Sequence, residues 1–399
     1  MDVLCKSGST GKIVYELYKK ASAAGHEAAV SYGRGAEVKE HNIFKFGLDW
    51  ETKFHALLTR ITGYTGCFSP FSTKRLIKFI DRFQPDIIHL HEPHAYFLNL
   101  RPFFEYLAAK KIPLVYTFHC EFAFTGKCGH PLQCENWKTG CGNCPNLRDY
   151  PKTIFFDHTA AMLKEKLRLL EMQNMVITSP SQWLADRTKL SLISNKDVRT
   201  IPNGIDTETL FYPRDFQHLR ERHGLKDEKV VLAVAPGLMA EHKGGRDVLR
   251  LAEKLENENI KFILIGLEPE ELKEKFAPNV IALGRTENQQ ELAEYYSMAD
   301  VFVICSDMEN LPTTCLEAVC CGTAVAGYDV GGTAETAPYP IGRFGPYGDI
   351  DALCKNVTEL MDAPAPPELF EKQRERFSVQ NMFIEYMSIY TELLDGKEK

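Results

Sequence analysis

The segment SDMENLPTTCLEAVCCG, residues 306–322, decides the fold of the second half of the chain. It follows a short apolar run that has the length of a buried strand. Thr313 is a residue type that caps helices, which predicts a helix from Thr314 to the glycine that closes the segment. Glu309 then lies on the loop before the helix, and Glu317 lies on its first turn.

Such a strand–loop–helix segment can hold a nucleotide. The first turn of a helix offers free backbone N–H groups and a positive dipole end, which suit a phosphate. A carboxylate can accept hydrogen bonds from both hydroxyls of a ribose. We therefore expect a nucleotide held by its sugar and its phosphates. Two solvated glutamates beside an ordinary helix are the alternative.

Length and composition describe a globular protein of two or three domains. The chain has 399 residues, is 44% hydrophobic and carries a net charge of −7, which gives no case for a nucleic-acid partner. No apolar run reaches the roughly 18 residues of a membrane span. The beginning of the sequence, MDVLCKSGSTG, lacks the apolar region of a signal peptide. We therefore expect a cytoplasmic protein.

Strand and helix patterns alternate along the chain. This order predicts parallel sheets with right-handed crossovers, hence an α/β fold of two Rossmann-like lobes facing a cleft. The predicted strands are residues 1–6, 28–31, 86–90, 113–118, 176–178 and 198–201, then 230–235, 260–265, 280–283, 299–305 and 323–328. A charged helix is expected to begin at Glu268.

The turn PNGID, residues 202–206, separates the two halves. Residues 1–205 form the first lobe, with a cysteine-rich loop at 120–146, and residues 206–375 form the second. Residues 376–399 form a terminal helix whose broad apolar face predicts that it crosses back to pack on the first lobe.

Three further positions are candidate site residues. Gly8 and Gly11 open the first helix and would let the backbone approach an anion, although a tight turn explains them equally. His119 stands at the carboxyl end of a predicted strand, where ligands bind in parallel sheets, although many such histidines are structural. Lys243 lies at a strand-to-helix junction and can neutralise a diphosphate, unless it is only a solvated lysine.

The cysteine-rich loop suggests a metal. Cys128, Cys134, Cys141 and Cys144 lie close together, and the last pair has the CxxC spacing of zinc sites. Four thiolates could hold a structural zinc in a loop with little core of its own. Free thiols are the alternative, and His130 is a spare ligand.

The segment from Trp50 to Phe83 reads as two basic amphipathic helices. It has six basic and two acidic residues, a net charge of +4, and its apolar residues Phe54, Leu57 and Ile61 have helical spacing. Such a face can rest on an anionic bilayer or receive an anionic lipid-linked acceptor. Two ordinary surface helices are the alternative.

Several segments of the chain together resemble a known family. It is similar to the retaining family-four glycosyltransferases with the GT-B fold, and within them to bacterial exopolysaccharide transferases of the colanic acid type. The resemblance runs from residue 7 to about residue 353. The segments that carry it are GSTGKI (8–13), YTFH (116–119), KTGCGNCP (138–145), SPSQWLA (179–185), IPNGID (201–206), HKGG (242–245), ENLPTTCLEAVCCGTAVAGYDVGGTAE (309–335) and FGPYGDIDAL (344–353).

The resemblance assigns roles to individual residues. Glu317 would bind the donor ribose, and Glu309 would face the transferred sugar. The catalytic residues would be His119, beside the sugar, with Glu309 and Lys243. The donor-binding residues would be Gly8, Gly11, Asn203, Lys243, Leu311, Thr313, Thr314 and Glu317.

The implied reaction is front-face transfer with retention. The departing diphosphate helps to deprotonate the incoming hydroxyl, while the enzyme stabilises that leaving group electrostatically. A helix dipole and Lys243 can do this without Mg²⁺, so no catalytic cofactor is expected. Asp349-Ile350-Asp351 reads as a surface turn rather than a metal site.

Two departures from the family pattern stand out. Many relatives have an arginine where this chain has Leu238, so Arg246, Arg285 or Lys12 would have to replace that cation. Relatives also have a longer first strand, whereas only about six residues precede Ser7 here.

The expected function is transfer of a hexose from a UDP- or GDP-sugar to a lipid-linked or glycan acceptor. It would serve surface polysaccharide synthesis at the inner face of the cell membrane. A nucleotide-sugar epimerase is an alternative, as is a catalytically weak binding or assembly subunit. A NAD-dependent dehydrogenase is disfavoured, because no GxGxxG follows a strand.

Overall fold

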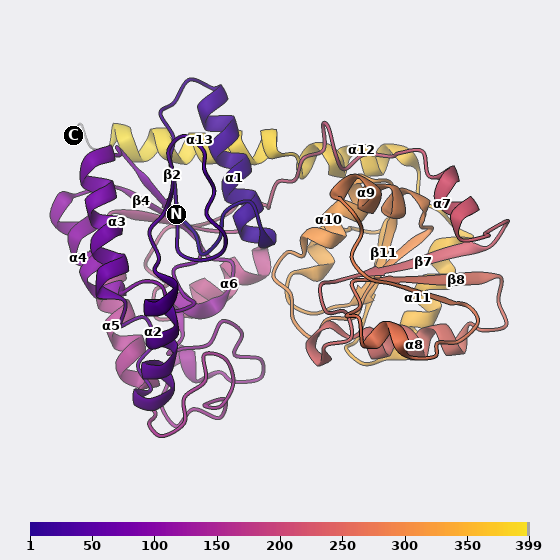
Figure 1. Ribbon diagram of the computed structural model, residues 1–399, viewed down its shortest axis with the longest axis horizontal. Helices are drawn as coiled ribbons and strands as arrows, with labels where there is room; N and C mark the ends of the chain where they lie inside the picture. Colours follow the sequence, from indigo (N-terminus) through magenta and orange to yellow (C-terminus); the bar gives the residue numbers. More distant parts are fainter. Residues whose placement is uncertain (397–399) are drawn as a thin grey trace. The chain divides into compact units, whose positions relative to one another are not determined.

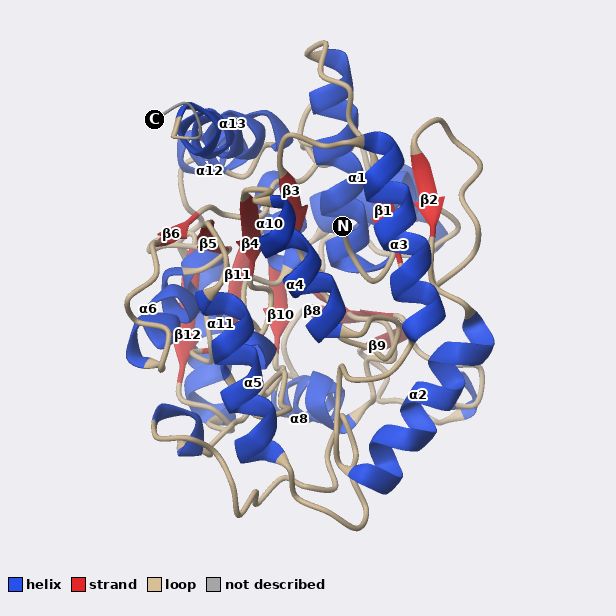
Figure 2. Ribbon diagram, turned by 90° about the vertical axis from the view of Figure 1, so that its left-hand side faces the viewer, coloured by secondary structure: helices blue, strands red, loops and turns tan. Residues whose placement is uncertain are grey.

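The computed structural model describes residues 1–396 (Figure 1). It divides into two compact units, residues 1–201 together with the chain from Met382 onward, and Pro202–Asn381. Residues 397–399, the end of the predicted terminal segment, lie outside the described residues. In each unit parallel strands are flanked by helices (Figure 2). The expected α/β fold of two parallel-sheet lobes is confirmed.

The first unit contains a four-stranded parallel sheet in the order β3-β4-β5-β6 and a separate parallel pair, β1-β2. The strands are β1 (Val30–Tyr32), β2 (Ile43–Lys45), β3 (Ile88–Leu90), β4 (Leu114–Thr117), β5 (Met175–Ser179) and β6 (Val198–Thr200). The helices are α1 (Gly8–Ala23), α2 (Asp49–Thr62), α3 (Pro70–Phe83), α4 (Leu100–Lys110), α5 (Thr159–Glu171) and α6 (Gln182–Leu190).

The first residues of the chain join these two sheets. The Asp2 amide donates to the carbonyl of Ser31 at 3.1 Å, and the His91 amide donates to the carbonyl of Met1 at 2.9 Å. Asp2 forms a single parallel bridge with Tyr32. The segment therefore lies between β1 and β3, in the place of a central strand, and forms this single bridge there.

The second unit is built on a six-stranded parallel sheet in the order β12-β11-β10-β7-β8-β9. The strands are β7 (Lys229–Val234), β8 (Ile260–Ile265), β9 (Val280–Leu283), β10 (Val301–Ile304), β11 (Ala324–Tyr328) and β12 (Gly342–Gly345). The helices are α7 (Gln217–Arg222), α8 (Gly245–Lys254), α9 (Gln289–Met298), α10 (Thr313–Cys320), α11 (Ile350–Asp362) and α12 (Pro367–Arg376). The helix predicted from Glu268 is wrong: only a 3-10 turn forms there, at Glu271–Lys273.

The last helix, α13 (Val379–Asp395), belongs mainly to the first unit. Its Tyr386 hydroxyl lies 3.0 Å from the Thr117 hydroxyl on β4, and its Tyr390 hydroxyl lies 2.6 Å from Nδ1 of His89 on β3. Because Tyr386 and Ile389 are also buried, the apolar face of α13 completes the core of the first unit. None of the helices in the described part of the chain is long and apolar enough to cross a membrane.

Candidate donor and sugar site

The loop between β10 and α10 carries the candidate donor residues of the second unit. The helix begins at Thr313, one residue earlier than predicted, and Pro312 rather than Thr313 occupies the N-cap position. Pro312 has φ of −65° and has no side-chain group that could cap the helix. Glu317 therefore lies on the second turn of α10. The amide of Cys315 donates to the Pro312 carbonyl at 3.1 Å, and those of Thr313 and Thr314 have no acceptor within the helix, as at any helix N-terminus.

Lys243 and Glu309 meet in this loop. Lys243 Nζ donates to Glu309 Oε1 at 2.7 Å, and the two side chains are 26% and 21% exposed. Lys243 ends the 3-10 turn Glu241–Lys243, which is joined to the β10 loop by the Asp307 amide donating to the His242 carbonyl at 3.2 Å. Two predicted catalytic residues, 66 positions apart in sequence, thus form one charged pair.

A pair of glycines after β11 positions Glu309, and the sequence reasoning missed this role. The Gly332 amide donates to the Glu309 carbonyl at 3.0 Å. Gly331 has φ of +60°, and a Cβ atom there would lie 1.8 Å from the same carbonyl oxygen. Only glycine allows this close approach. The available signal was the dipeptide itself, because adjacent glycines after a strand mark a close backbone contact.

We expect Gly331→Ala to destabilise the second unit more than Gly237→Ala does. Gly237 has a similar φ of +61°, but a Cβ atom added there would have nothing within 4 Å, so it isolates the conformational term. That term is about 1–2 kcal/mol, and the overlap with Glu309 adds about 1–3 kcal/mol. Urea unfolding of both variants measures the difference. Equal losses would show that Gly331 does not support the Glu309 loop.

Glu317 is held in place from behind. Its side chain is 6% exposed, and Oε2 accepts a hydrogen bond from the Tyr296 hydroxyl of α9 at 3.0 Å. Asn203 supports the same loop, because its Nδ2 donates to the Leu311 carbonyl at 3.3 Å. Asn203 and Leu311 therefore have a structural role beside their predicted donor role. Thr313 and Thr314 are partly exposed at the start of α10.

Leu238 takes no part in a charged site. It is 3% exposed and belongs to the apolar core of the second unit. Of the replacement cations considered, Arg246 and Arg285 lie in this unit and are exposed, and Lys12 lies in the first unit and is also exposed. What replaces the family arginine stays a prediction.

His119 of the first unit is one end of a row of histidines. Its Nε2 lies 2.9 Å from Nδ1 of His91, and the His91 ring stacks on His89 with centroids 4.1 Å apart. His89 in turn contacts the Thr117 hydroxyl at 2.6 Å and the hydroxyl of Tyr390. Burial lowers the pKa of His119 to about 4 and the pKa values of His89 and His91 well below their usual range. These imidazoles are therefore neutral.

His91 was not singled out from the sequence, although its position was informative. His89 and His91 alternate at the end of β3, and β3 pairs with β4, the strand that leads to His119.

Local backbone structure explains why residues 8 and 11 are both glycine. Gly8 has φ of +67°, and a Cβ at Gly11 would lie 3.0 Å from the backbone carbon of Leu4. Their donor role stays a prediction.

The four clustered cysteines surround one small cavity, which Cys128, Cys134, Cys141 and Cys144 all line. Cys128 and Cys144 hydrogen-bond to each other, and Cys141 Sγ accepts from the Gly126 amide at 3.2 Å. Within residues 1–396, however, no three of these sulfur atoms lie within 4.8 Å of one another. The structural zinc therefore stays a prediction.

Comparison with known proteins identifies the family. Residues 10–209 match the model described as Glycosyltransferase Family 4, and residues 215–380 match that of Glycosyl transferases group 1. The chain belongs to glycosyltransferase family 4. The resemblance read from the sequence motifs is confirmed.

Two curated relatives agree with this assignment. The chain is 26% identical over 325 residues, 77% of each protein, to the Escherichia coli K12 protein named "Putative colanic acid biosynthesis glycosyl transferase WcaC". It is 27% identical over 237 residues, 56% of this chain and 61% of the relative, to N-acetyl-alpha-D-glucosaminyl L-malate synthase of Bacillus anthracis.

Among solved structures, sucrose-phosphate synthase from Thermosynechococcus elongatus has a TM-score of 0.69 at 18% identity, over 99% of this chain and 96% of that one. HepE of Anabaena in complex with UDP-glucose has a TM-score of 0.65 at 16% identity, over 98% and 99% of the two chains. These likenesses confirm the GT-B fold for the family-four chain.

Proposed function

We propose that this family-four glycosyltransferase transfers a hexose from a nucleotide sugar to a lipid-linked or glycan acceptor, with retention of configuration. The observation that carries the proposal is the Lys243–Glu309 pair beside the leading amides of α10, with the buried carboxylate of Glu317 on the next turn. The cation and the helix N-terminus match the diphosphate of a nucleoside diphosphate sugar, and the carboxylate of Glu317 matches its ribose.

The proposed step breaks the bond between the anomeric carbon and the diphosphate oxygen and forms a bond to the acceptor oxygen. The acceptor proton passes to the departing diphosphate. Lys243 and the leading amides of α10 stabilise the charge that develops on that group. Glu309 holds Lys243 and faces the sugar, and Glu317 binds the ribose. His119, a neutral imidazole, can donate or accept a hydrogen bond at the sugar.

Two similar proteins support this proposal. HepE was solved with UDP-glucose, and the Escherichia coli relative is named for colanic acid biosynthesis. We propose that the reaction serves surface polysaccharide synthesis at the inner face of the cell membrane, with a UDP- or GDP-sugar as donor.

A thermal-shift screen with UDP, GDP and their sugars, followed by product analysis, tests the proposal. We expect one nucleotide to raise the melting temperature and its sugar to be hydrolysed or transferred. Stabilisation without sugar turnover would support a binding or assembly subunit. Conversion of one nucleotide sugar into its epimer would support an epimerase. If no nucleotide stabilises the protein, the donor-site assignment is wrong.

The outward face of α2 supports a membrane-bound acceptor. The usual burial pattern of an amphipathic helix is reversed in α2. The helix buries Glu51, His55 and other polar residues and exposes an apolar stripe. We call this stripe the α2 apolar face; it consists of Trp50, Phe54, Leu57 and Ile61, which are 41–57% exposed. Glu51 points inward because its carboxylate accepts hydrogen bonds from the amides of Phe71 and Ser72 at the start of α3, at 2.8 and 2.7 Å.

Exposed basic and aromatic residues also lie on α2, on α3 and on a loop joined to the end of α2. The six basic residues of α2 and α3 are all exposed: Lys53, Arg60, Lys74, Arg75, Lys78 and Arg82. Phe155 and Phe156 are 67% and 54% exposed on a loop that the Ile154 amide joins to the Arg60 carbonyl at 2.9 Å. Exposed apolar side chains on a pair of helices with exposed cations suit an anionic bilayer, so we propose peripheral binding through this face.

We expect the double variant Trp50→Ser/Phe54→Ser to bind anionic vesicles at least tenfold more weakly. Inserting each of these side chains into the bilayer is worth about 1.5–3 kcal/mol, and vesicle flotation measures the loss. Leu190→Ser/Leu192→Ser is the matched control, since those side chains are 62% and 45% exposed elsewhere in the same unit. Equal binding by wild type and the first variant would exclude this face as the docking surface.

A further inference from the structure

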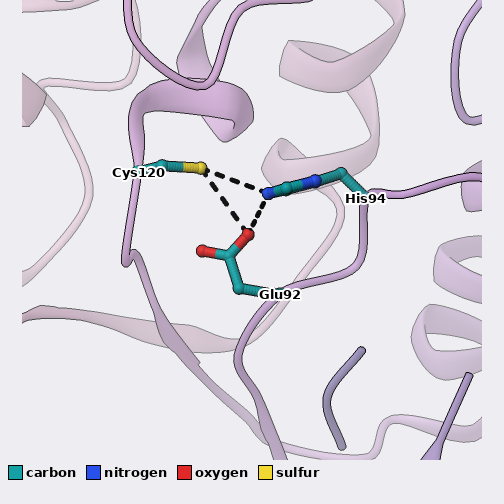
Figure 3. A group of neighbouring side chains, drawn as sticks. All are labelled: Glu92, His94 and Cys120. Atoms are coloured by element: carbon teal, nitrogen blue, oxygen red, sulfur yellow. Dashed lines mark hydrogen bonds and ion pairs between the residues drawn. The ribbon is translucent and has the colours of Figure 1, made fainter. Parts of the chain in front are cut away.

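A second cluster of reactive side chains lies next to His119. Glu92 and His94 follow β3, and Cys120 follows β4, so adjacent parallel strands bring the three to the same edge of the sheet (Figure 3). Cys120 Sγ lies 3.5 Å from His94 Nε2 and 3.6 Å from Glu92 Oε2, and His94 Nε2 forms an ion pair with Glu92 Oε2. The sequence reasoning did not identify this cluster.

The geometry of the three atoms resembles a metal-binding site. A tetrahedral zinc ion, about 2.3 Å from sulfur and about 2.0–2.1 Å from nitrogen or oxygen, separates its ligand atoms by roughly 3.3–3.5 Å. Both contacts of the Cys120 sulfur already have that length. Only His94 Nε2 and Glu92 Oε2, which form an ion pair, would have to move apart, to about 3.3 Å. The metal ion would then take the place of the hydrogen between these two atoms.

The surroundings favour a defined site over a surface ion pair. The side chains of Glu92 and His94 are 9% and 21% exposed, so they are held in place and yet reachable. The Glu92 amide donates to Asp2 Oδ1 at 3.2 Å, which fixes the loop from behind. Ala95 and Tyr96, directly after His94, have φ values of +77° and +71°, a strained conformation for residues with side chains.

We propose that Glu92, His94 and Cys120 bind one divalent transition-metal ion of the zinc class. Thiolate, imidazole and carboxylate are all zinc ligands, and three protein ligands leave a fourth position open. Glu92 follows His91 and Cys120 follows His119, so the ion cross-links the two loops that hold the His91–His119 pair. Its role is to position that pair. The site is separate from the cysteine-rich loop and does not depend on the identity of the donor.

Cobalt substitution tests the proposal on the full-length chain. The Cys144→Ser variant is used as the background, so that the cysteine-rich loop does not contribute. Co²⁺ added to this metal-free protein should give the absorption band of a cobalt–thiolate bond, and Zn²⁺ should displace it at one equivalent. In that background we expect Cys120→Ser to abolish the band and Glu92→Gln to weaken zinc binding at least tenfold, because each loses a charged ligand. Cys144→Ser by itself is the matched control in the predicted zinc loop and should keep the band of the wild type.

Three outcomes would overturn the proposal. They are the absence of a cobalt–thiolate band in the wild type, a band of full intensity in Cys120→Ser/Cys144→Ser, or loss of the band in Cys144→Ser alone, which would place the metal in the cysteine-rich loop. Circular dichroism establishes whether each variant is folded. If Cys120→Ser/Cys144→Ser does not fold, the zinc affinity of Glu92→Gln/Cys144→Ser decides, and an affinity equal to that of Cys144→Ser would contradict the site.

Discussion

Lys243→Met is expected to lower kcat by about 10²–10³-fold, because it removes a cation from the charge that develops on the departing diphosphate. The methionine keeps most of the side-chain volume, so the loop can retain its shape. Glu309 loses its partner at 2.7 Å and would add negative charge where the diphosphate leaves, which deepens the loss. Initial rates with saturating donor measure the effect.

Lys254→Met is the matched control for this prediction. Lys254 also forms a 2.7 Å ion pair in the second unit, with Asp351, but its side chain is 47% exposed and that of Asp351 is 86% exposed. Such surface pairs contribute about 0–1 kcal/mol, so this variant should keep its rate. A Lys243→Met enzyme that is folded and turns over within threefold of the wild type would remove Lys243 from the catalytic residues.

Glu317→Ala is expected to weaken nucleotide binding by about 10–100-fold. Hydrogen bonds to a charged group are worth about 1.5–3 kcal/mol, and the ribose offers two hydroxyls to this carboxylate. The site is already desolvated, with Glu317 only 6% exposed, so water replaces the lost bonds poorly. Isothermal titration with the nucleotide selected by the thermal-shift screen measures the dissociation constant.

Tyr296→Phe separates this binding role from a structural one. It removes the hydroxyl that donates to Glu317 at 3.0 Å but leaves the carboxylate in place. We expect a loss of stability of about 1 kcal/mol, the usual worth of one buried hydrogen bond, with nucleotide affinity changed only a few-fold. Full nucleotide affinity in a folded Glu317→Ala variant would refute the ribose assignment.

The amino-acid sequence by itself determined the fold class, the family and most elements of the second unit. Most of its strands are rich in apolar residues, because both faces of a parallel sheet are buried, and β8 (Ile260–Ile265) and β9 (Val280–Leu283) have the predicted bounds. The helix α13 (Val379–Asp395) was equally readable, since its apolar residues recur at helical spacing. These patterns involve only residues that are close together in the chain, so they can be recognised in one sequence.

Only the tertiary structure decided which side chains meet and which face outward. Cys120 contacts Glu92 and His94 because β3 and β4 pair in register, and no local pattern specifies that register. Helical spacing located the apolar residues of α2 but not their exposure, because an apolar stripe reads the same whether it packs on a core or faces a bilayer.

The segment of residues 306–322 shows the same division between sequence and tertiary structure. The sequence placed Glu309 before a helix and Glu317 on it. The structure added the Lys243 pair, the Tyr296 hydroxyl behind Glu317 and the close contact with Gly331. Each of these partners is distant in sequence, and their contacts depend on packing geometry that arises only when the sheet has formed.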